Sequence, residues 1–351
     1  MWIRRFQPQL RKLSDSIPVK RKYNASKWTT GSGLVTSLGA AWYYYEYWHH
    51  VELSPDYFTK YRISYNGKID SDHFVLELIP LKRQRKNWWK TMTSDRVWSV
   101  EIKQPEIMVV RNYTPLPLEH VGGGRLQVFP DDEHRDGKLL FYMKKYQYGE
   151  VARWLSSLPE GYQIELRGPY LDHRLQSQTE KQRDRRYLSA SDSGDLSMDQ
   201  FSHQPYDIAT FTAGTGIAPI MQILLTEYPF AGRILFFHSC RTEKELGPLL
   251  PILERLQHAN RLELHLFSSQ SGRDLRNNSE KVLSLIPTPT IYQQRPFDGF
   301  GGPLRPILSL VCGPDGYIST VSGVKFDLSQ GPVGGLLAEK GWNNSNVFKF
   351  S

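Results

Sequence analysis

The chain has 351 residues, of which 39% are hydrophobic and 23% are charged, and its formal net charge is +8. This length supports about two domains with their own cores and a modest additional segment. The charge would permit binding to nucleic acid, but the basic residues gather at the N-terminus and in short runs without interleaved stacking residues, which argues against that partner. The only two cysteines, Cys240 and Cys312, exclude a CxxC dithiol, a cysteine zinc site and a disulfide framework, although one disulfide between them is possible.

The first 27 residues are strongly basic. They contain one acid, Asp15, against eight basic residues, a composition typical of a mitochondrial presequence. The basic residues are Arg4, Arg5, Arg11, Lys12, Lys20, Arg21, Lys22 and Lys27. We therefore expect residues 1–27 to form a presequence-like segment.

Residues 28–48 follow as a segment suited to crossing a membrane. No charge occurs from Trp28 to Tyr45, and a helix of that length rises about 27 Å, close to the hydrocarbon thickness of a bilayer. Aromatic residues occur at both ends, as in interfacial belts. We predict a transmembrane helix, with a linker that carries an amphipathic surface-lying segment as the alternative. The preceding positive charge predicts an N-terminus in the matrix and a body in the intermembrane space.

Short strands are expected over residues 55–171. Their β-branched and aromatic residues and their spacing predict a small antiparallel barrel. A turn is expected at Asn66-Gly67, and the basic stretch 82–90 is expected to be a solvated loop. The expected strands are 57–66, 73–81, 97–103, 107–111 and 140–146.

The remainder of the chain changes character twice. Residues 172–207 are dominated by Gln, Ser, Asp, Arg and Glu, which predicts a polar linker or surface insertion. Over residues 208–351 apolar strands alternate with helices, which predicts an open, mainly parallel α/β sheet. The expected strands are 208–212, 233–238, 261–267 and 307–312, and the expected helices are 220–227 and 243–257.

Two motifs in the first half contain residue types that suit a flavin dinucleotide. In Arg-Asn-Tyr-Thr-Pro at 111–115, strand alternation places Arg111 and Tyr113 on one face, beside the hydroxyl of Thr114. Gly-Glu-Val-Ala at 149–152 opens a helix predicted over 151–158, where backbone N–H groups and the helix dipole would favour a phosphate. Each motif alone is also explained by an ordinary strand end or a strand-turn-helix junction.

Two motifs in the second half have the pattern of a second nucleotide site. Thr-Ala-Gly-Thr-Gly-Ile-Ala-Pro at 212–219 predicts a strand, a glycine turn and a helix in which Pro219 takes an early position. Cys-Gly-Pro at 312–314 ends a predicted parallel strand, where open α/β sheets bind ligands. A simple tight turn and a buried small cysteine are the alternatives.

In this order, the four motifs resemble those of the ferredoxin-NADP reductase superfamily, and within it the NADH-cytochrome b5 reductase branch, over roughly residues 55–351. Lys144 and Tyr146, Arg-Gly-Pro at 167–169 and Thr-Glu-Lys at 242–244 match further family elements. The resemblance implies an FAD-binding barrel over 55–171, an NAD(P)-binding α/β domain over 208–351, and hydride transfer from NADH or NADPH to FAD.

The resemblance also implies the site residues. Thr114 and Cys312 would flank the reacting atoms as catalytic residues, and no histidine has metal-ligand spacing, so no metal site is predicted. The FAD-binding residues would be Arg111, Tyr113, Thr114, Lys144, Tyr146, Gly149, Val151 and Ala152. The nicotinamide dinucleotide would contact Gly214, Thr215, Gly216, Cys312 and Gly313.

Several positions depart from the family pattern. Ala152 replaces a serine or threonine, which removes one phosphate hydrogen bond, and Leu171 and Ala213 replace glycines. Residues 267–270 lack the acid that NADH-specific relatives carry, while Arg273 is close in sequence, so both NADH and NADPH are kept as donors.

The basic N-terminus, the predicted membrane helix and these departures resemble a narrower group, the fungal mitochondrial inner-membrane flavoproteins that assist haem attachment to cytochrome c. That resemblance implies haem, apocytochrome c and the haem-attachment machinery as partners, with electrons passing from the flavin to ferric haem. Two alternatives are an NADH-cytochrome b5 reductase that donates to a haem protein, and a flavin-containing assembly factor without catalytic activity.

Overall fold

The computed structural model describes Ser37, Gly39, Trp42 and residues 51–92, 96–129, 137–175, 206–225, 233–289, 308–326 and 329–350. The chain divides into two units, 1–49 and 50–351, and the three described residues of the first are helical. The expected presequence, most of the expected membrane segment and most of the polar insertion 172–207 lie outside the described residues. Among the residues that are described, no helix is both long enough and apolar enough to span a bilayer.

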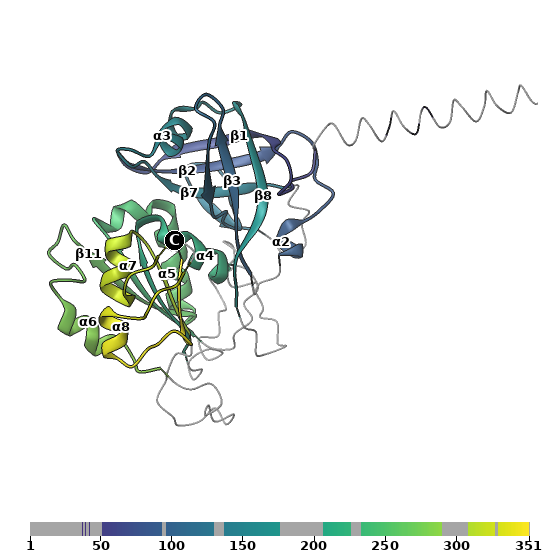
Figure 1. The fold of residues 1–351 in the computed structure, drawn as a ribbon. Helices are drawn as coiled ribbons and strands as arrows, with labels where there is room; N and C mark the ends of the chain where they lie inside the picture. Colours follow the sequence, from purple (N-terminus) through teal and green to yellow (C-terminus); the bar gives the residue numbers. More distant parts are fainter. Residues whose placement is uncertain are drawn as a thin grey trace, which may run out of the picture. The chain divides into compact units, whose positions relative to one another are not determined.

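The first half of the second unit is a six-stranded antiparallel sheet that curves into a half-barrel (Figure 1). Alternate side chains point inward to a core that includes Tyr61, Trp98 and Phe141, while their neighbours point outward. Helix α3 (Glu150–Ser157) adds Val151 and Leu155 to the same core. In spatial order the strands are β4 (Val109–Tyr113), β3 (Arg96–Gln104), β8 (Gln163–Arg174), β1 (Thr59–Lys68), β2 (His73–Pro80) and β7 (Leu139–Lys144).

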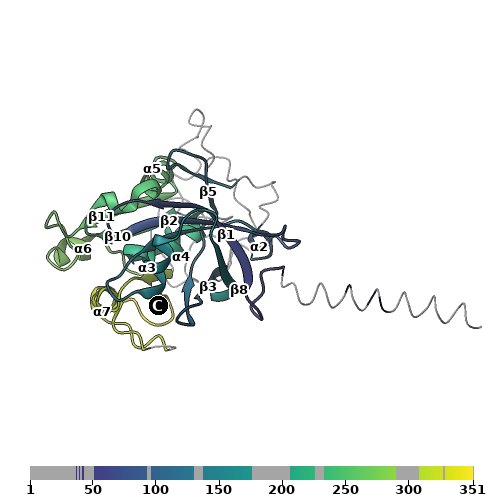
Figure 2. The same cartoon turned by 90° about the horizontal axis from the view of Figure 1, so that it is seen from above.

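The second half is a five-stranded parallel sheet with helices on both faces (Figures 1 and 2). One face packs against α6 (Ser279–Leu285), α7 (Asp315–Ser322) and α8 (Gly335–Glu339). The other face packs against α4 (Ala218–Leu225) and α5 (Leu250–His258). The strands, in spatial order, are β11 (Leu262–Ser268), β10 (Arg233–Cys240), β9 (Tyr206–Ala213), β12 (Leu308–Cys312) and β13 (Val347–Lys349).

The two halves share a continuous apolar core. Helix α4 lies between them, and all eight of its residues are buried. Its side chains pack with sheet residues such as Phe236 and with half-barrel residues such as Val97 and Leu140. The short hairpin of β5 (Leu118–His120) and β6 (Leu126–Val128) contributes to this core as well. Burial of this much apolar surface holds the two halves together as one unit.

The first residues of this unit are fastened to the half-barrel by side chains. The Leu53 N–H donates to Gln84 Oε1 at 2.7 Å, and Gln84 Nε2 donates to the Val51 carbonyl at 2.6 Å. The Glu52 carboxylate accepts from the Arg85 N–H at 2.8 Å. Gln84 thus holds the loop that precedes the short helix α2 (Trp88–Thr91) against the start of the body.

Four sequence-based expectations were wrong in detail. The stretch 82–90 is not simply a solvated loop, because α2 begins within it and Gln84 and Trp89 are buried. Asn66-Gly67 is not a turn, because β1 runs on to Lys68 and Gly67 pairs with Val75; the Asn66 amide instead donates to two carbonyls at the end of α3. The strand expected at 107–111 begins at Val109, after a turn in which Met108 has a φ of 54°. The helix expected over 243–257 is broken at Gly247, whose φ is 49° and which is followed by a proline.

Candidate functional site

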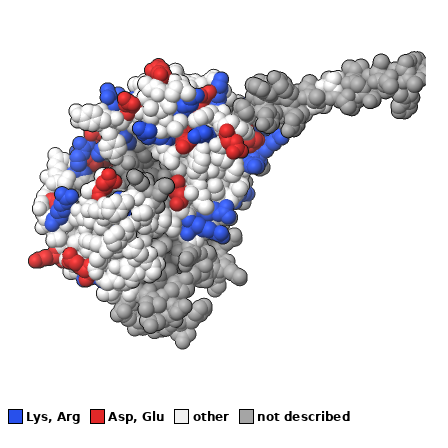
Figure 3. Space-filling model, viewed as in Figure 1, with Lys and Arg blue, Asp and Glu red and all other residues white. Residues whose placement is uncertain are grey.

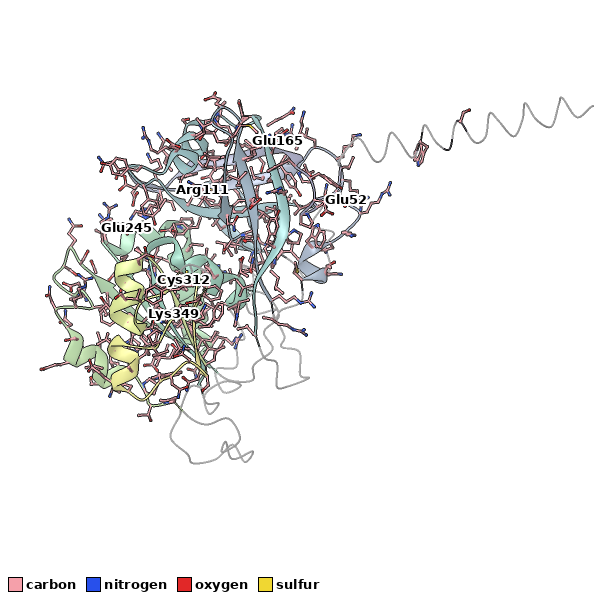
Figure 4. The ribbon with its side chains drawn as sticks, in the orientation of Figure 1. Glu52, Arg111, Glu165, Glu245, Cys312 and Lys349 are labelled. Carbon is pink, nitrogen blue, oxygen red and sulfur yellow. The ribbon has the colours of Figure 1, made fainter. Side chains whose placement is uncertain are left out.

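A cavity of about 580 Å³ lies between the half-barrel and the parallel sheet. Twelve of the thirteen cofactor-binding residues predicted from the sequence line it, and Gly214 is the one that does not. Figure 4 shows Arg111 on the half-barrel and Cys312 on the parallel-sheet half. The lining residues among those predicted are Arg111, Tyr113, Thr114, Lys144, Tyr146, Gly149, Val151, Ala152, Thr215, Gly216, Cys312 and Gly313.

The half-barrel wall of the cavity contains a cation, aromatic rings and a hydroxyl. Arg111 is exposed on β4, and its guanidinium donates only locally, to the Val110 carbonyl at 2.9 Å, among the described contacts. Burial raises the pKa of the Tyr113 phenol, so this group stays protonated and can donate a hydrogen bond. Lys144 Nζ lies 5.7 Å from the centroid of the Tyr146 ring. This wall can therefore bind an anion beside a flat aromatic ligand.

Helix α3 points its N-terminus into the same wall. It begins after Gly149, and within the described residues no side chain caps its first N–H groups. A Cβ at Gly149 would lie 3.2 Å from that of Tyr146, so the glycine allows the turn between β7 and the helix to be tight. Val151 and Ala152 are buried, but Glu150 is exposed and lines the cavity. The free N–H groups favour a phosphate, whereas the Glu150 carboxylate opposes one.

The opposite wall is formed by the glycine turn after β9. Gly214 has a φ of 55°, which favours glycine, and the 3-10 turn η3 (Gly214–Ile217) leads directly into α4. A Cβ at Gly216 would lie 2.5 Å from the Cys312 carbonyl oxygen, so this position accepts no side chain without a backbone shift. Across the cavity, the Tyr146 hydroxyl lies 3.5 Å from Thr215 Oγ1, where either group can donate.

Cys312 is the last residue of β12 and belongs to the same wall of the cavity. Burial raises the pKa of its thiol to about 12, an effect that nearby Lys325 opposes and Asp172 reinforces. The thiol is therefore neutral at physiological pH and is not a nucleophile. Neither Cys312 nor Cys240 is in a disulfide. A neutral, polarisable group of this size suits contact with the face of an uncharged ring.

Sequence reasoning missed several residues of the cavity. Glu150 lies within the motif at 149–152, which predicts no role for it, and Tyr148, which is 87% exposed at the rim, lies outside all four motifs. Alternation along β7 could have found Phe141 and Met143, because they occupy inward-facing positions of a predicted strand. The remaining lining residues are Val109, Asn112, Tyr142, Ala213, Ala218, Pro219, Pro314 and Asp315.

A second cavity of about 330 Å³ opens at the carboxyl ends of β10 and β11. Ser239, Ser269 and Tyr317 line it with hydroxyl groups, and Asp274 and Arg276 add one charge of each sign. Ser269 belongs to residues 267–270, which lack the acid that NADH-specific relatives carry. This cavity offers polar partners for a ribose without a clear preference for a free or a phosphorylated hydroxyl.

No protein-family model matches the chain. It is 46% identical over 349 residues to the cytochrome c mitochondrial import factor of Saccharomyces cerevisiae, and the match covers 95% of this chain and 94% of that protein. The chain belongs to the family of this import factor. The fungal group suggested by the N-terminal composition and the departures from the reductase pattern is thereby confirmed.

Two more distant relatives confirm the wider superfamily. The chain is 25% identical over 307 residues to an uncharacterized FAD-binding protein of Schizosaccharomyces pombe, with 86% of this chain and 90% of that one covered. It is 24% identical over 301 residues to NADH-cytochrome b5 reductase 2 of Meyerozyma guilliermondii, with 78% and 85% covered.

Solved structures confirm the fold. The cytochrome b5 reductase domain of the Ulva prolifera nitrate reductase matches with a TM-score of 0.51 at 15% identity, over 85% of this chain and 99% of that one. An Amycolatopsis cytochrome P450 reductase matches with a TM-score of 0.50 at 13% identity, over 83% and 68%. An antiparallel half-barrel followed by a parallel α/β sheet, as the sequence predicted, is the architecture of these reductases.

Proposed function

We propose that this chain is a mitochondrial FAD oxidoreductase, anchored in the inner membrane with its body in the intermembrane space, that takes hydride from NADH or NADPH and passes electrons to haem during cytochrome c maturation. The observation that carries the proposal is the single cavity that Arg111, Thr114 and Gly149 share with Gly216 and Cys312. The names of the FAD-binding and NADH-cytochrome b5 reductase relatives support the redox chemistry, and the name of the import factor supports the mitochondrial and cytochrome c-linked role.

In this proposal residues 55–171 bind FAD and residues 208–351 bind NAD(P)H. The donor set fits a flavin dinucleotide: Arg111 and the N–H groups at the start of α3 would hold the pyrophosphate, and Tyr113 and Thr114 would offer hydroxyl groups to the rest of the cofactor. The fit is imperfect at Ala152, which has no hydroxyl, and at Glu150, which adds negative charge. The cofactor when bound supplies the hydride-accepting and electron-delivering chemistry.

The protein's contribution is orientation and exclusion of water. Gly216 allows the turn after β9 to lie directly against the end of β12, so Thr215 and Cys312 form one continuous wall opposite Thr114. A nicotinamide on this wall would face a flavin ring on the other. Because binding would already hold the two rings in this arrangement, less entropy would be lost when they react. Because the Cys312 thiol stays neutral, it places no charge beside the nicotinamide.

The test is anaerobic stopped-flow absorbance of the full-length chain reconstituted with FAD. The protein is mixed with NADH or NADPH and then with ferric haem or cytochrome b5. Flavin bleaching followed by reoxidation on ferric haem is the expected result, and the faster nucleotide identifies the donor. Bound FAD that neither nucleotide reduces would contradict the proposal and favour an assembly factor without catalytic activity.

A second candidate is an NADH-cytochrome b5 reductase, which the names of several relatives favour. An acidic haem protein would then dock on a basic surface, and the rate should fall steeply with salt. Figure 3 shows acidic and basic side chains interspersed over the visible face of the body rather than one basic field. We therefore expect weak salt dependence; transfer to cytochrome b5 alone, with a steep salt dependence, would support the second candidate.

A further inference from the structure

Gln222 is the one polar side chain of helix α4, whose sequence is Ala-Pro-Ile-Met-Gln-Ile-Leu-Leu. The residue is 1% exposed and lies in the apolar layer between the parallel sheet and the half-barrel. Burial of an amide costs free energy unless its hydrogen-bonding groups find partners. An apolar residue of similar size would fill the same space without this requirement, but it would leave unpaired the groups that the amide bonds.

The Gln222 amide makes three hydrogen bonds to the backbone of the half-barrel. Its Oε1 accepts from the Trp98 N–H at 2.9 Å, and its Nε2 donates to the Trp98 carbonyl at 3.1 Å and to the Pro115 carbonyl at 2.8 Å. Trp98 is itself 1% exposed, on β3. One side chain of the parallel-sheet half therefore holds two points of the other half by three buried hydrogen bonds.

Gln222 and its partner Pro115 are each close in sequence to a residue that lines a wall of the cavity. Pro115 directly follows Thr114, which lines the half-barrel wall. Ala218 lies one helical turn before Gln222, about 6 Å along the helix axis, and lines the opposite wall together with Gly216. Thus only short stretches of backbone separate the Gln222 amide from the residues on either side of the cavity.

We propose that Gln222 is a positioning residue that sets the register between the two walls, and thereby the geometry of hydride transfer. This rests on the proposed function, and Gln222 itself is not among the residues that line the cavity. The apolar contacts around α4 are non-directional and would allow the halves to slide by a fraction of a side chain, whereas three hydrogen bonds with fixed geometry select one arrangement. A displacement of about 1 Å at a reacting centre can cost about 100-fold in rate.

The test is the substitution Gln222→Met, which keeps the size of the side chain and removes all three bonds. In stopped-flow experiments with the FAD-reconstituted full-length protein, we expect the limiting rate of flavin reduction to fall about 10- to 100-fold, while the dissociation constants of FAD and NAD(P)H change by less than about threefold. The long-wavelength charge-transfer absorbance between flavin and nicotinamide should weaken as well. In the protein without cofactor, hydrogen exchange at the Trp98 amide should accelerate.

The matched control is Asp72→Asn. It removes the 2.8 Å ion pair between Asp72, on the half-barrel, and Arg241, on the other half, a partly exposed pair of which neither residue lines the cavity. A merely structural role for Gln222 predicts that both variants lose stability and that neither changes the reduction rate. Normal reduction and charge-transfer absorbance in Gln222→Met, or an equal fall in Asp72→Asn, would overturn the proposal.

A second variant covers failure of Gln222→Met to fold. Gln222→Glu retains an acceptor for the Trp98 N–H and, when ionised, loses both donors, so an intermediate fall in rate is expected and an unchanged rate would overturn the proposal. Failure of the proposed function is recognised separately, since the wild-type flavin would then not be bleached by either nucleotide. In that case, unaltered hydrogen exchange at the Trp98 amide in Gln222→Met would still show that the amide does not hold the two halves in register.

Discussion

Helices α3 and α4 both begin at a glycine turn beside the cavity, yet they are built differently. Helix α3 lies at the rim: Val151, Ala152 and Leu155 are buried, while Arg153 on its other face is exposed. Helix α4 has no exposed face, because the sheet packs on one side of it and the half-barrel on the other. Similar local sequence signals thus produce one helix that can adjust its position and one that cannot.

This difference between α3 and α4 predicts that ligand binding and alignment of the two walls depend on different helices. A change at the start of α3 alters the charge and hydrogen bonds offered to a ligand, and the exposed side of the helix can relax around it. A change at the start of α4 acts differently, because apart from the end that borders the cavity this helix is packed against the parallel sheet on one side and the half-barrel on the other. We therefore expect changes near α3 to affect mainly affinity and changes near α4 to affect mainly the reaction rate.

The largest effect is expected for Gly216→Ala, before α4. The new Cβ would lie 2.5 Å from the Cys312 carbonyl oxygen and 2.9 Å from the Gly313 nitrogen, so the turn or the end of β12 must shift. We expect reduction by NAD(P)H to slow by more than about 100-fold while FAD stays bound, as measured by stopped-flow absorbance and by flavin fluorescence. Wild-type rates in this variant would show that α4 is less constrained than its burial indicates.

Arg111→Ala comes next and tests the phosphate cradle shared with α3. Loss of a charge-assisted hydrogen bond costs about 1.5–3 kcal/mol, so FAD affinity in a fluorescence titration should fall about 10- to 150-fold with a nearly normal reduction rate at saturation. Arg153→Ala, an exposed arginine of α3 outside the cavity lining, is the control. A similar loss of affinity in the control would point to general charge rather than a specific contact.

The junction between β8 of the half-barrel and β13 of the parallel sheet is expected to be sensitive to acid. The His173 ring of β8 stacks on Phe348 of β13 with centroids 3.7 Å apart, and burial lowers the pKa of the imidazole to about 4. The pKa of histidine in the unfolded chain is about 6.5, so folding favours the neutral imidazole. The free energy of unfolding is therefore undiminished by this group above pH 6.5, and it decreases as the pH falls towards 4. Partial exposure reduces this loss to the order of 1–2 kcal/mol.

His173→Phe should keep the ring contact and remove this titration. Urea unfolding at pH 7.5 and pH 4.5 would measure the effect, with the wild type losing on the order of 1–2 kcal/mol more than the variant between the two values. Equal losses in the two proteins would mean that the acid sensitivity of the junction arises elsewhere.

The smallest effect is expected for Glu150→Gln at the start of α3. The Glu150 carboxylate lines the cavity and repels a bound phosphate, so its removal favours binding. The same carboxylate interacts favourably with the dipole of α3, so its removal also costs the helix some stability. We expect FAD to bind about two- to fivefold more tightly, an effect of about 0.3–1 kcal/mol. Glu160→Gln, an exposed acid beyond the end of the helix, is the control and should leave FAD binding unchanged.

Local sequence signals predicted much of the fold and the candidate site. Runs of apolar, β-branched and aromatic residues identified β2 and β12 to within a residue or two. The four motifs contain ten of the twelve predicted residues that the structure places around one cavity, and the Lys-x-Tyr element supplies the other two. These predictions succeed because strand periodicity and glycine turns act over a few neighbouring residues.

The failures arose where distant residues decide the structure. Asn66-Gly67 has the composition of a turn, but pairing with β2 and the hydrogen bonds from Asn66 to the end of α3 keep it within a strand. The sequence predicts a helix around Gln222 but no role for this residue, because its partner Trp98 lies 124 positions away in the sequence. Such a contact depends on how the two halves pack, which no local pattern contains.

The fastening at the start of the body also determines how this protein responds to mechanical load. A pull on the chain before Val51 acts first on the hydrogen bonds that Gln84 makes with Val51 and Leu53, and on the 2.6 Å bond from Thr59 Oγ1 to the Glu52 carbonyl. Thr59 is the first residue of β1 and Gln84 follows β2, so these bonds pass the load to the neighbourhood of both strands. Neither β1, β2 nor residues 81–87 contribute to the cavity lining, so a load on the N-terminal side enters the body outside that lining.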